Sequence, residues 1–157
     1  MSRDWDQVWL EEAIWKGQKR SKDRSRKVGA VIVNDRNVEV ATGWNGFPRG
    51  VNDDVEERHQ RPTKYLWTEH AERNAIYNAA AEGRATKGCR IYSALYPCSG
   101  CAGAIIQAGI REVVTIEPDW DDPTYKEDWA VSREKMAEAG VTVRFIEGEQ
   151  PQRKSDV

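Results

Sequence analysis

The chain has 157 residues, a formal net charge of -2 at pH 7, 39% hydrophobic residues and 32% charged residues. This balance is typical of one globular domain and excludes a disordered, charge-dominated chain. No stretch approaches the roughly 18 apolar residues that a membrane span needs, and residues 1–10 lack a signal-peptide pattern. We therefore expect a cytoplasmic protein with reduced thiols and no overall positive field to attract nucleic acid.

Taken in chain order, the predicted elements begin with a helix and a hairpin and then alternate between helices and strands. The opening helix rests on Trp5, Trp9 and Ala13 at four-residue spacing, and the first strand on a β-branched apolar run. The elements are helix 5–19, strand 28–33, strand 38–44, helix 71–82, strand 89–95, helix 99–108, strand 112–116, helix 123–139 and strand 141–146.

Two segments lack such a pattern. Residues 45–68 show no periodicity, so we expect a long functional or mobile loop, and residues 148–157 read as a frayed polar tail. Strands that alternate with helices after a first hairpin predict a mixed five-stranded sheet with helices on both faces. The predicted fold class is a three-layer α/β/α sandwich, forming a single domain over residues 1–147.

Two short motifs each lie at a predicted helix start. His70 and Glu72 stand two residues apart, and Cys98 and Cys101 follow in the segment Pro-Cys-Ser-Gly-Cys. One imidazole and two thiolates leave the fourth tetrahedral position of a zinc ion for water, whose pKa the metal lowers to about 7. Glu72, which is not a ligand, can then take and return protons. The combined pattern is the signature of the zinc deaminases.

Two other readings of Cys98 and Cys101 are a thioredoxin-like redox pair and half of a structural zinc site. A redox pair should follow the first strand of a βαβ unit, whereas these cysteines come late in the chain. A structural site needs a fourth ligand at close spacing, and Cys89 and His59 do not form a second pair. We therefore predict a catalytic zinc. The loop over residues 51–68 contains no Cys and only His59, so we expect one ion per chain.

From Trp5 to about Ile146 the chain resembles the deoxycytidylate (dCMP) deaminases. The zinc motif marks only the broader cytidine-deaminase-like superfamily, whereas the loop Gly-Trp-Asn-Gly-Phe-Pro over residues 43–48 is a more specific pointer to deoxycytidylate. The other matching stretches are 21–23, 28–33, 70–76, 95–101 and 105–110.

The resemblance implies hydrolysis at carbon 4 of cytosine, which converts dCMP to dUMP and ammonia and supplies dUMP for thymidylate synthesis. Glu72 would protonate ring nitrogen 3 and then the departing ammonia. By the same resemblance Asn45 would contact the sugar, and the Ala71 backbone N–H the carbonyl oxygen of the base. Tyr96 would wall the base pocket, although core packing explains this residue equally well.

The substrate phosphate has candidates in the basic segment 19–27, which leads into the first strand. Bidentate guanidinium contacts suit a phosphate monoester, so Arg24 and Arg26 are predicted to bind it. A solvated basic loop is at least as good a reading for either one. Family members often carry Pro or Thr in this turn, so these arginines depart from the pattern.

Regulation and assembly are further implications of the resemblance. The family is activated by dCTP and inhibited by dTTP at a second site near the Gly-Trp-Asn-Gly loop. Trp44, Gly46 and Arg49 are therefore candidates for an allosteric site, with residues 52–54 for a Mg²⁺ ion that accompanies the triphosphate. The resemblance also implies a homo-oligomer, from dimer to hexamer.

Three competing functions remain. A tRNA adenosine deaminase has a segment like residues 101–106, but Tyr96 stands where that group would have Glu, and nucleic acid is an unlikely partner for this charge. A deaminase of free cytidine usually lacks the predicted helix 123–139. A non-catalytic zinc-binding scaffold of the same fold would not need the intact Glu72.

Overall fold

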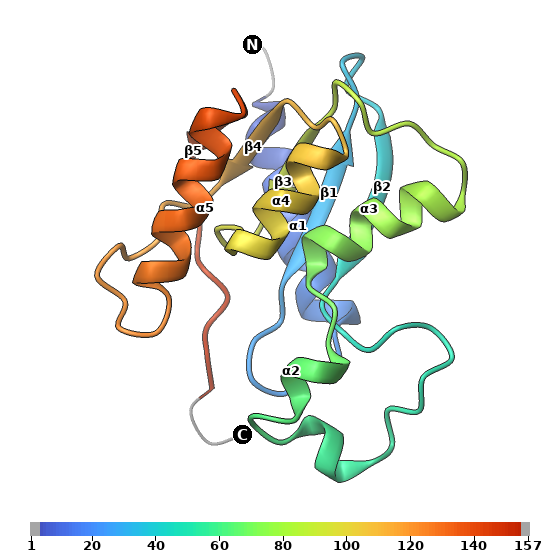
Figure 1. Ribbon diagram of the computed structural model, residues 1–157. Helices are drawn as coiled ribbons and strands as arrows, with labels where there is room; N and C mark the ends of the chain where they lie inside the picture. Colours follow the sequence, from blue (N-terminus) through green and yellow to red (C-terminus); the bar gives the residue numbers. More distant parts are fainter. Residues whose placement is uncertain (1–3, 155–157) are drawn as a thin grey trace.

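The computed structural model describes residues 4–154 (Figure 1). Its centre is a five-stranded sheet with the strand order β2-β1-β3-β4-β5. Strand β1 (Gly29–Val33) runs antiparallel to both β2 (Glu39–Trp44) and β3 (Arg90–Ser93). Strands β4 (Glu112–Thr115) and β5 (Thr142–Phe145) continue from β3 in parallel. The predicted mixed sheet is confirmed.

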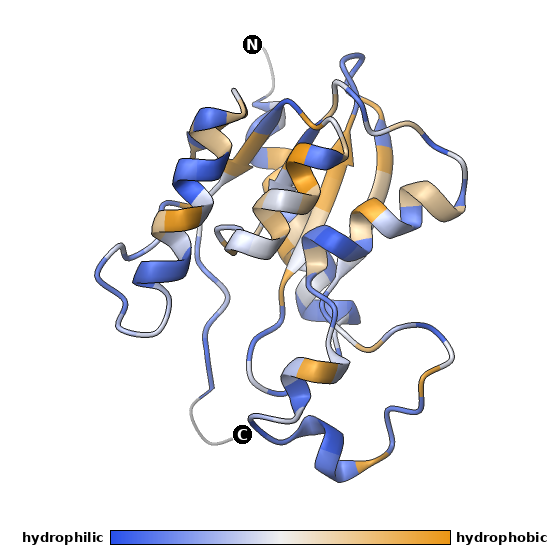
Figure 2. Ribbon diagram, viewed as in Figure 1, coloured by the Kyte–Doolittle hydropathy of each residue, from blue (hydrophilic) through white to orange (hydrophobic). Residues whose placement is uncertain are grey.

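Helices cover both faces of this sheet (Figure 1). Helix α1 (Trp5–Arg20) packs on one face, and α3 (Ala71–Ala81), α4 (Ser99–Gln107) and α5 (Lys126–Glu138) cover the other. Alternate residues of β1 separate into the two cores, which is why its whole sequence is apolar (Figure 2). The three-layer α/β/α fold is therefore confirmed. Among residues 4–154, no helix has the length and apolar character needed to cross a membrane.

The last helix starts later than predicted. We expected it from Pro123, whereas α5 begins at Lys126. The Asp122 carboxylate accepts hydrogen bonds from the backbone N–H groups of Thr124 and Tyr125, at 2.8 and 3.1 Å. This side chain stabilises a turn in place of the first helical turn.

The loop over residues 45–68 contains more structure than predicted. It holds a 3₁₀ turn, η1 (Glu56–His59), and a short helix, α2 (Lys64–Trp67). The Lys64 ammonium lies 3.1 Å from the Asp23 carboxylate, and both side chains are largely buried. Elements of four residues are too short to produce a visible periodicity, so the sequence pattern missed them.

The prediction of a frayed tail was wrong for residues 148–154. Pro151 is buried, the Lys154 N–H donates to the Ser25 carbonyl at 2.7 Å, and the Gln150 amide donates to the Glu117 carbonyl. The tail therefore runs back to the segment that precedes β1 (Figure 1). These contacts are mainly backbone hydrogen bonds, which leave no hydrophobic pattern. Residues 155–157 lie outside the described part of the chain.

Helix α3 approaches the sheet closely at Gly43 of β2. A Cβ atom at Gly43 would lie 2.3 Å from the Ala75 nitrogen and 2.5 Å from the Ala71 oxygen. Only a glycine permits this backbone-to-backbone contact. It presses the first turn of α3, which carries Glu72, against the sheet.

A polar network on the other face joins α1 to β3 and β5. The Asp6 carboxylate accepts hydrogen bonds from the Tyr92 hydroxyl and from Arg144, each at 2.6 Å, and Arg144 also pairs with Glu112. The hydrogen bond from Arg144 is the main reason that the pKa of Asp6 lies below its ordinary value. Burial, together with the hydrogen bond to Asp6, raises the pKa of Tyr92 to about 12.

Replacing Asp6 with asparagine should therefore reduce the free energy of unfolding at pH 7 by about 1–2 kcal/mol, the low end for charged hydrogen bonds, because the pair is partly exposed. A depressed folded-state pKa adds stability above the unfolded value and loses it as the pH falls through the folded one. The difference between Asp6→Asn and wild type should therefore shrink below pH 3.8, the ordinary pKa of aspartate. Urea unfolding of wild type and Asp6→Asn at pH 7 and pH 3 measures this difference in the free energy of unfolding, with Glu11→Gln at an exposed position as the control. An equal loss at both pH values would contradict the prediction.

Candidate active site

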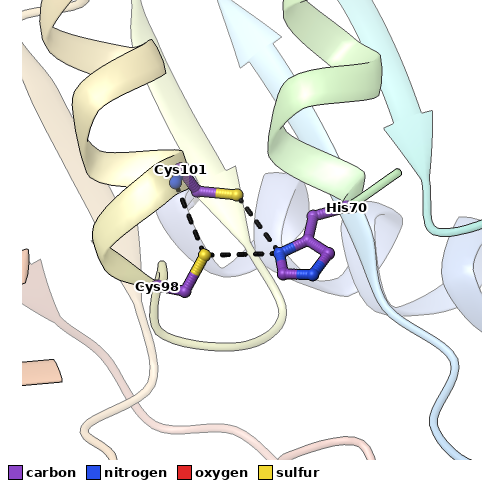
Figure 3. A group of neighbouring side chains, drawn as sticks. All are labelled: His70, Cys98 and Cys101. Atoms are coloured by element: carbon purple, nitrogen blue, oxygen red, sulfur yellow. Dashed lines mark hydrogen bonds between the residues drawn. The ribbon is translucent and has the colours of Figure 1, made fainter. Parts of the chain in front are cut away.

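Three candidate metal ligands meet at the start of two helices (Figure 3). His70 is the residue before α3, and Cys98 is the residue before α4. The Nδ1 atom of His70 lies 3.3 Å from the Cys98 sulfur and 3.5 Å from the Cys101 sulfur. Tetrahedral zinc, with its usual bond lengths to nitrogen and sulfur, would hold such atoms about 3.5 Å apart. The triangle therefore fits a zinc ion.

One of the three groups, Cys98, is held in the ionised form that a metal ion binds, while the other two keep their protons until the metal arrives. A hydrogen bond from the Cys101 thiol lowers the pKa of Cys98 below its ordinary value and favours its thiolate. Donating that bond raises the pKa of Cys101, and a hydrogen bond with Cys98 raises the pKa of His70. Two adjacent thiolates repel each other, so a metal ion is needed to release the proton of Cys101. The positive N-terminus of α4 and the Arg73 guanidinium, 3.9 Å from the Cys101 sulfur, add favourable charge.

Glu72 lies in the first turn of α3 and is 4% exposed. The hydroxyl of Ser93, at the end of β3, lies 2.7 Å from the Glu72 Oε1 atom. The Thr115 hydroxyl in turn donates to the Ser93 carbonyl at 2.8 Å. Sequence reasoning missed Ser93, for which the available signal was a serine inside an apolar strand. Its contact restricts the Glu72 carboxylate.

A cavity of about 150 Å³ opens beside these residues. His70, Ala71, Glu72 and Cys98 contribute to its lining. Segments far apart in the sequence complete the wall with Arg26, Arg61, Tyr125 and Arg153. Two of the three candidate metal ligands, His70 and Cys98, therefore face the same space as a group of basic side chains.

The sequence profile described as the cytidine and deoxycytidylate deaminase zinc-binding region matches residues 3–117. The chain belongs to this family. It is 40% identical over 146 residues to the deoxycytidylate deaminases of Mus musculus and Homo sapiens, covering 90% of this chain and 79% of each relative. The dCMP deaminase of cyanophage S-TIM5, solved in complex with dCMP and dUMP, is 25% identical. It has a TM-score of 0.70, with 93% of this chain and 99% of that chain covered.

Two residues that we predicted to contact the substrate, Asn45 and Tyr96, line the cavity and also contact neighbouring protein groups. Asn45 accepts hydrogen bonds from the Ser21 hydroxyl and the Val28 N–H, and its amide donates to the Arg26 carbonyl at 2.7 Å. Tyr96 is 2% exposed and packs edge-on against Trp120 and Trp129. Tyr96 is therefore a core residue that also forms part of the cavity wall, and its contact with a base stays a prediction.

The two arginines predicted to bind phosphate lie in different places. Arg26 lines the cavity, whereas Arg24 pairs with Glu56 at 2.7 Å and lies outside it. The structure thus does not bring Arg24 to the candidate metal site. Sequence reasoning missed Arg61 and Arg153, since neither belongs to a motif.

The predicted allosteric residues of the deaminase gather around a second hollow of about 350 Å³. Trp44, Gly46 and Arg49 line it, together with Arg24 and Asp53. Gly46 also pairs with Glu69 through two backbone hydrogen bonds of 2.8 and 3.1 Å, which tie this loop to the residue before His70. These backbone hydrogen bonds therefore join the wall of the second hollow to the segment that carries His70.

Proposed function

We propose that this protein hydrolyses dCMP to dUMP and ammonia, with one zinc ion held by His70, Cys98 and Cys101. One observation carries the proposal: His70 and Cys98 line the same cavity as Arg26 and Arg61, each of which has a buried nitrogen without a hydrogen-bond partner. The 40% identity to deoxycytidylate deaminases supports the substrate class.

The arginines support a substrate that bears a phosphate. Among the described residues, the Nε and Nη1 atoms of Arg26 and the Nε atom of Arg61 are buried without a hydrogen-bond partner. Burial lowers the pKa of Arg26, and the guanidinium groups of Arg26 and Arg153 lie 5.7 and 5.9 Å from the centre of the Tyr125 ring. Buried donors without partners are unfavourable, and a phosphate monoester satisfies several of them with charge-assisted bonds.

The chemistry assigned to the site follows from Glu72. When bound, zinc acts as a Lewis acid that makes water nucleophilic at neutral pH. Glu72 takes a proton from the attacking water and delivers it to ring nitrogen 3 of cytosine. It then takes the second proton, from the hydroxyl group now bonded to carbon 4, and passes it to the amino group, which leaves as ammonia while the carbonyl of the product forms. Ser93 holds this carboxylate, and the Ala71 N–H, which heads α3 without a helical partner, binds the base carbonyl oxygen.

The direct test measures ammonia release by the zinc-loaded protein from dCMP, deoxycytidine, CMP and a tRNA anticodon stem-loop. We expect turnover of dCMP well above that of deoxycytidine, since only dCMP carries the phosphate. Turnover of the stem-loop in place of dCMP would establish the adenosine deaminase alternative. Zinc binding without any turnover would favour the scaffold alternative.

The phosphate assignment predicts a selective binding defect. Replacing Arg26 or Arg153 with alanine should raise KM for dCMP by about 10- to 100-fold, the equivalent of one charge-assisted hydrogen bond, and leave deoxycytidine turnover unchanged. Arg24→Ala is the matched control, since Arg24 pairs with Glu56 outside the cavity. Steady-state kinetics on both substrates measures the effect. Equal losses on dCMP and deoxycytidine would contradict the phosphate role.

Several predictions stay open to experiment: regulation by dCTP and dTTP, a Mg²⁺ ion with the triphosphate, a homo-oligomer and a cytoplasmic location. The second hollow supports a regulatory nucleotide because Arg20, Lys22 and Arg49 contribute positive charge to its wall. The exposed Leu66 and Trp15 side chains, at 86% and 54%, supply apolar surface for subunit contacts.

A further inference from the structure

We propose that one face of α5 positions the turn that carries the metal-binding cysteines. This α5 clamp consists of Asp128, Ser132 and Lys135. The proposal rests on the metal-binding role of Cys98 and Cys101 and does not depend on the identity of the substrate.

The clamp residues contact the backbone on both sides of Cys98. The two Asp128 carboxylate oxygens accept hydrogen bonds from the Ser99 N–H at 2.8 Å and from the Ser99 hydroxyl at 2.6 Å. The Ser132 hydroxyl donates to the Pro97 carbonyl at 2.8 Å. The Lys135 ammonium lies 3.2 Å from the Ser99 carbonyl, to which it donates.

Helical geometry explains why these three side chains act together. Positions 128, 132 and 135 follow the spacing i, i+4 and i+7, so they share one face of α5. Figure 1 shows α5 beside α4, and the hydrogen bonds of Asp128 and Ser132 direct this face of α5 toward the start of α4. The α5 clamp therefore binds residues 97 and 99 and leaves the side chain of Cys98 available to a metal.

Burial makes these contacts effective. Ser132 is completely buried. If its hydroxyl were removed, the Pro97 carbonyl would lose its hydrogen-bond donor, and water could not easily replace it. Asp128 satisfies a backbone N–H at the start of α4, where helical partners are absent. The Cys101 N–H remains directed at the Cys98 sulfur, at 3.4 Å. The orientation of the thiolate turn thus depends on α5.

Charge alone does not explain Asp128. A carboxylate near the site disfavours thiolates but attracts a divalent cation, so the two effects of its charge oppose each other. The contribution that we assign to Asp128 comes from its two hydrogen bonds to Ser99. Two variants separate the charge from the hydrogen bonds. Asp128→Asn loses the charge and keeps an oxygen acceptor, whereas Asp128→Ala loses the charge and both acceptors.

The test measures the zinc affinity of the full chain by competition with a chromophoric chelator, and the absorption spectrum of the Co²⁺-substituted protein. Asp128→Ala should weaken zinc binding by about 10- to 100-fold, the usual effect of losing a partner that orients a ligand, and should change the thiolate–Co²⁺ bands. Asp128→Asn should retain more affinity than Asp128→Ala. Glu127→Ala is the matched control, because it removes the same charge from an exposed neighbouring position.

Wild-type zinc affinity in Asp128→Ala, with only a lower melting temperature of the metal-free protein, would mean that Asp128 merely packs two helices and would overturn the proposal. So would equal weakening by Glu127→Ala. If Asp128→Ala does not fold, Ser132→Ala decides, since wild-type affinity and spectrum in that variant would also overturn it. Because no substrate is present, failure of the proposed dCMP activity does not affect these outcomes.

Discussion

Replacing Glu72 with glutamine is expected to lower kcat for dCMP by about 100- to 10,000-fold, the usual contribution of a general acid–base. The side chain is buried, and the amide oxygen can still accept the Ser93 hydrogen bond, so the shape of the site should persist. What disappears is the group that we propose carries a proton from water to the base. Ammonia release and the metal content of the same sample measure both effects.

The outcome is informative only if zinc stays bound. Glu72→Gln should contain as much zinc as the wild type, and Glu82→Gln, an exposed change at the end of α3, should leave kcat unaltered. Substantial turnover by zinc-loaded Glu72→Gln would refute the assigned role of this carboxylate. Loss of zinc would instead place Glu72 among the groups that hold the metal.

Replacing Cys101 with alanine should remove both zinc and activity. Cys101 is completely buried, and its sulfur lies 3.5 Å from His70 Nδ1. Loss of one ligand should weaken zinc binding by roughly 3 kcal/mol or more, about a quarter of the free energy of a four-ligand zinc site. Zinc content after gel filtration and residual deamination measure the effect.

Cys89→Ala is the matched control, since Cys89 is buried at the start of β3 and lies outside the candidate metal group. This variant should keep one zinc per chain and normal turnover. Chelator treatment of the wild type should abolish activity, and added Zn²⁺ should restore it. Full activity of metal-free protein would contradict the zinc-dependent mechanism.

Much of the site could be predicted because its ligands sit in short local patterns. His70 and Glu72 open one helix, and Cys98 and Cys101 open another, so each pair is already oriented by a single helical turn. The sheet is needed only to bring the two helix starts, and so the two pairs of residues, close together. The positions of the strands along the chain followed from runs of β-branched residues to within two residues at each end, whereas their order in the sheet was not predicted.

Other parts of the site have no local signature. Arg153 reaches the cavity because the tail docks on Ser25, and Arg61 reaches it from the loop before α2. Arg24 and Arg26 are two residues apart and equally basic, yet they lie in different hollows. Spacing along the chain carries no information on which of them faces the cavity.

The sequence by itself determined the periodic elements, the metal-ligand spacing and the family, because each depends on residues close together in the chain or on short motifs. Tertiary structure alone decided which arginines share the cavity, how Ser93 holds Glu72 and how α5 contacts the cysteine turn. Those contacts join residues 21 to more than 100 positions apart. They depend on how the packed layers bring distant segments together, and the local pattern does not encode that arrangement.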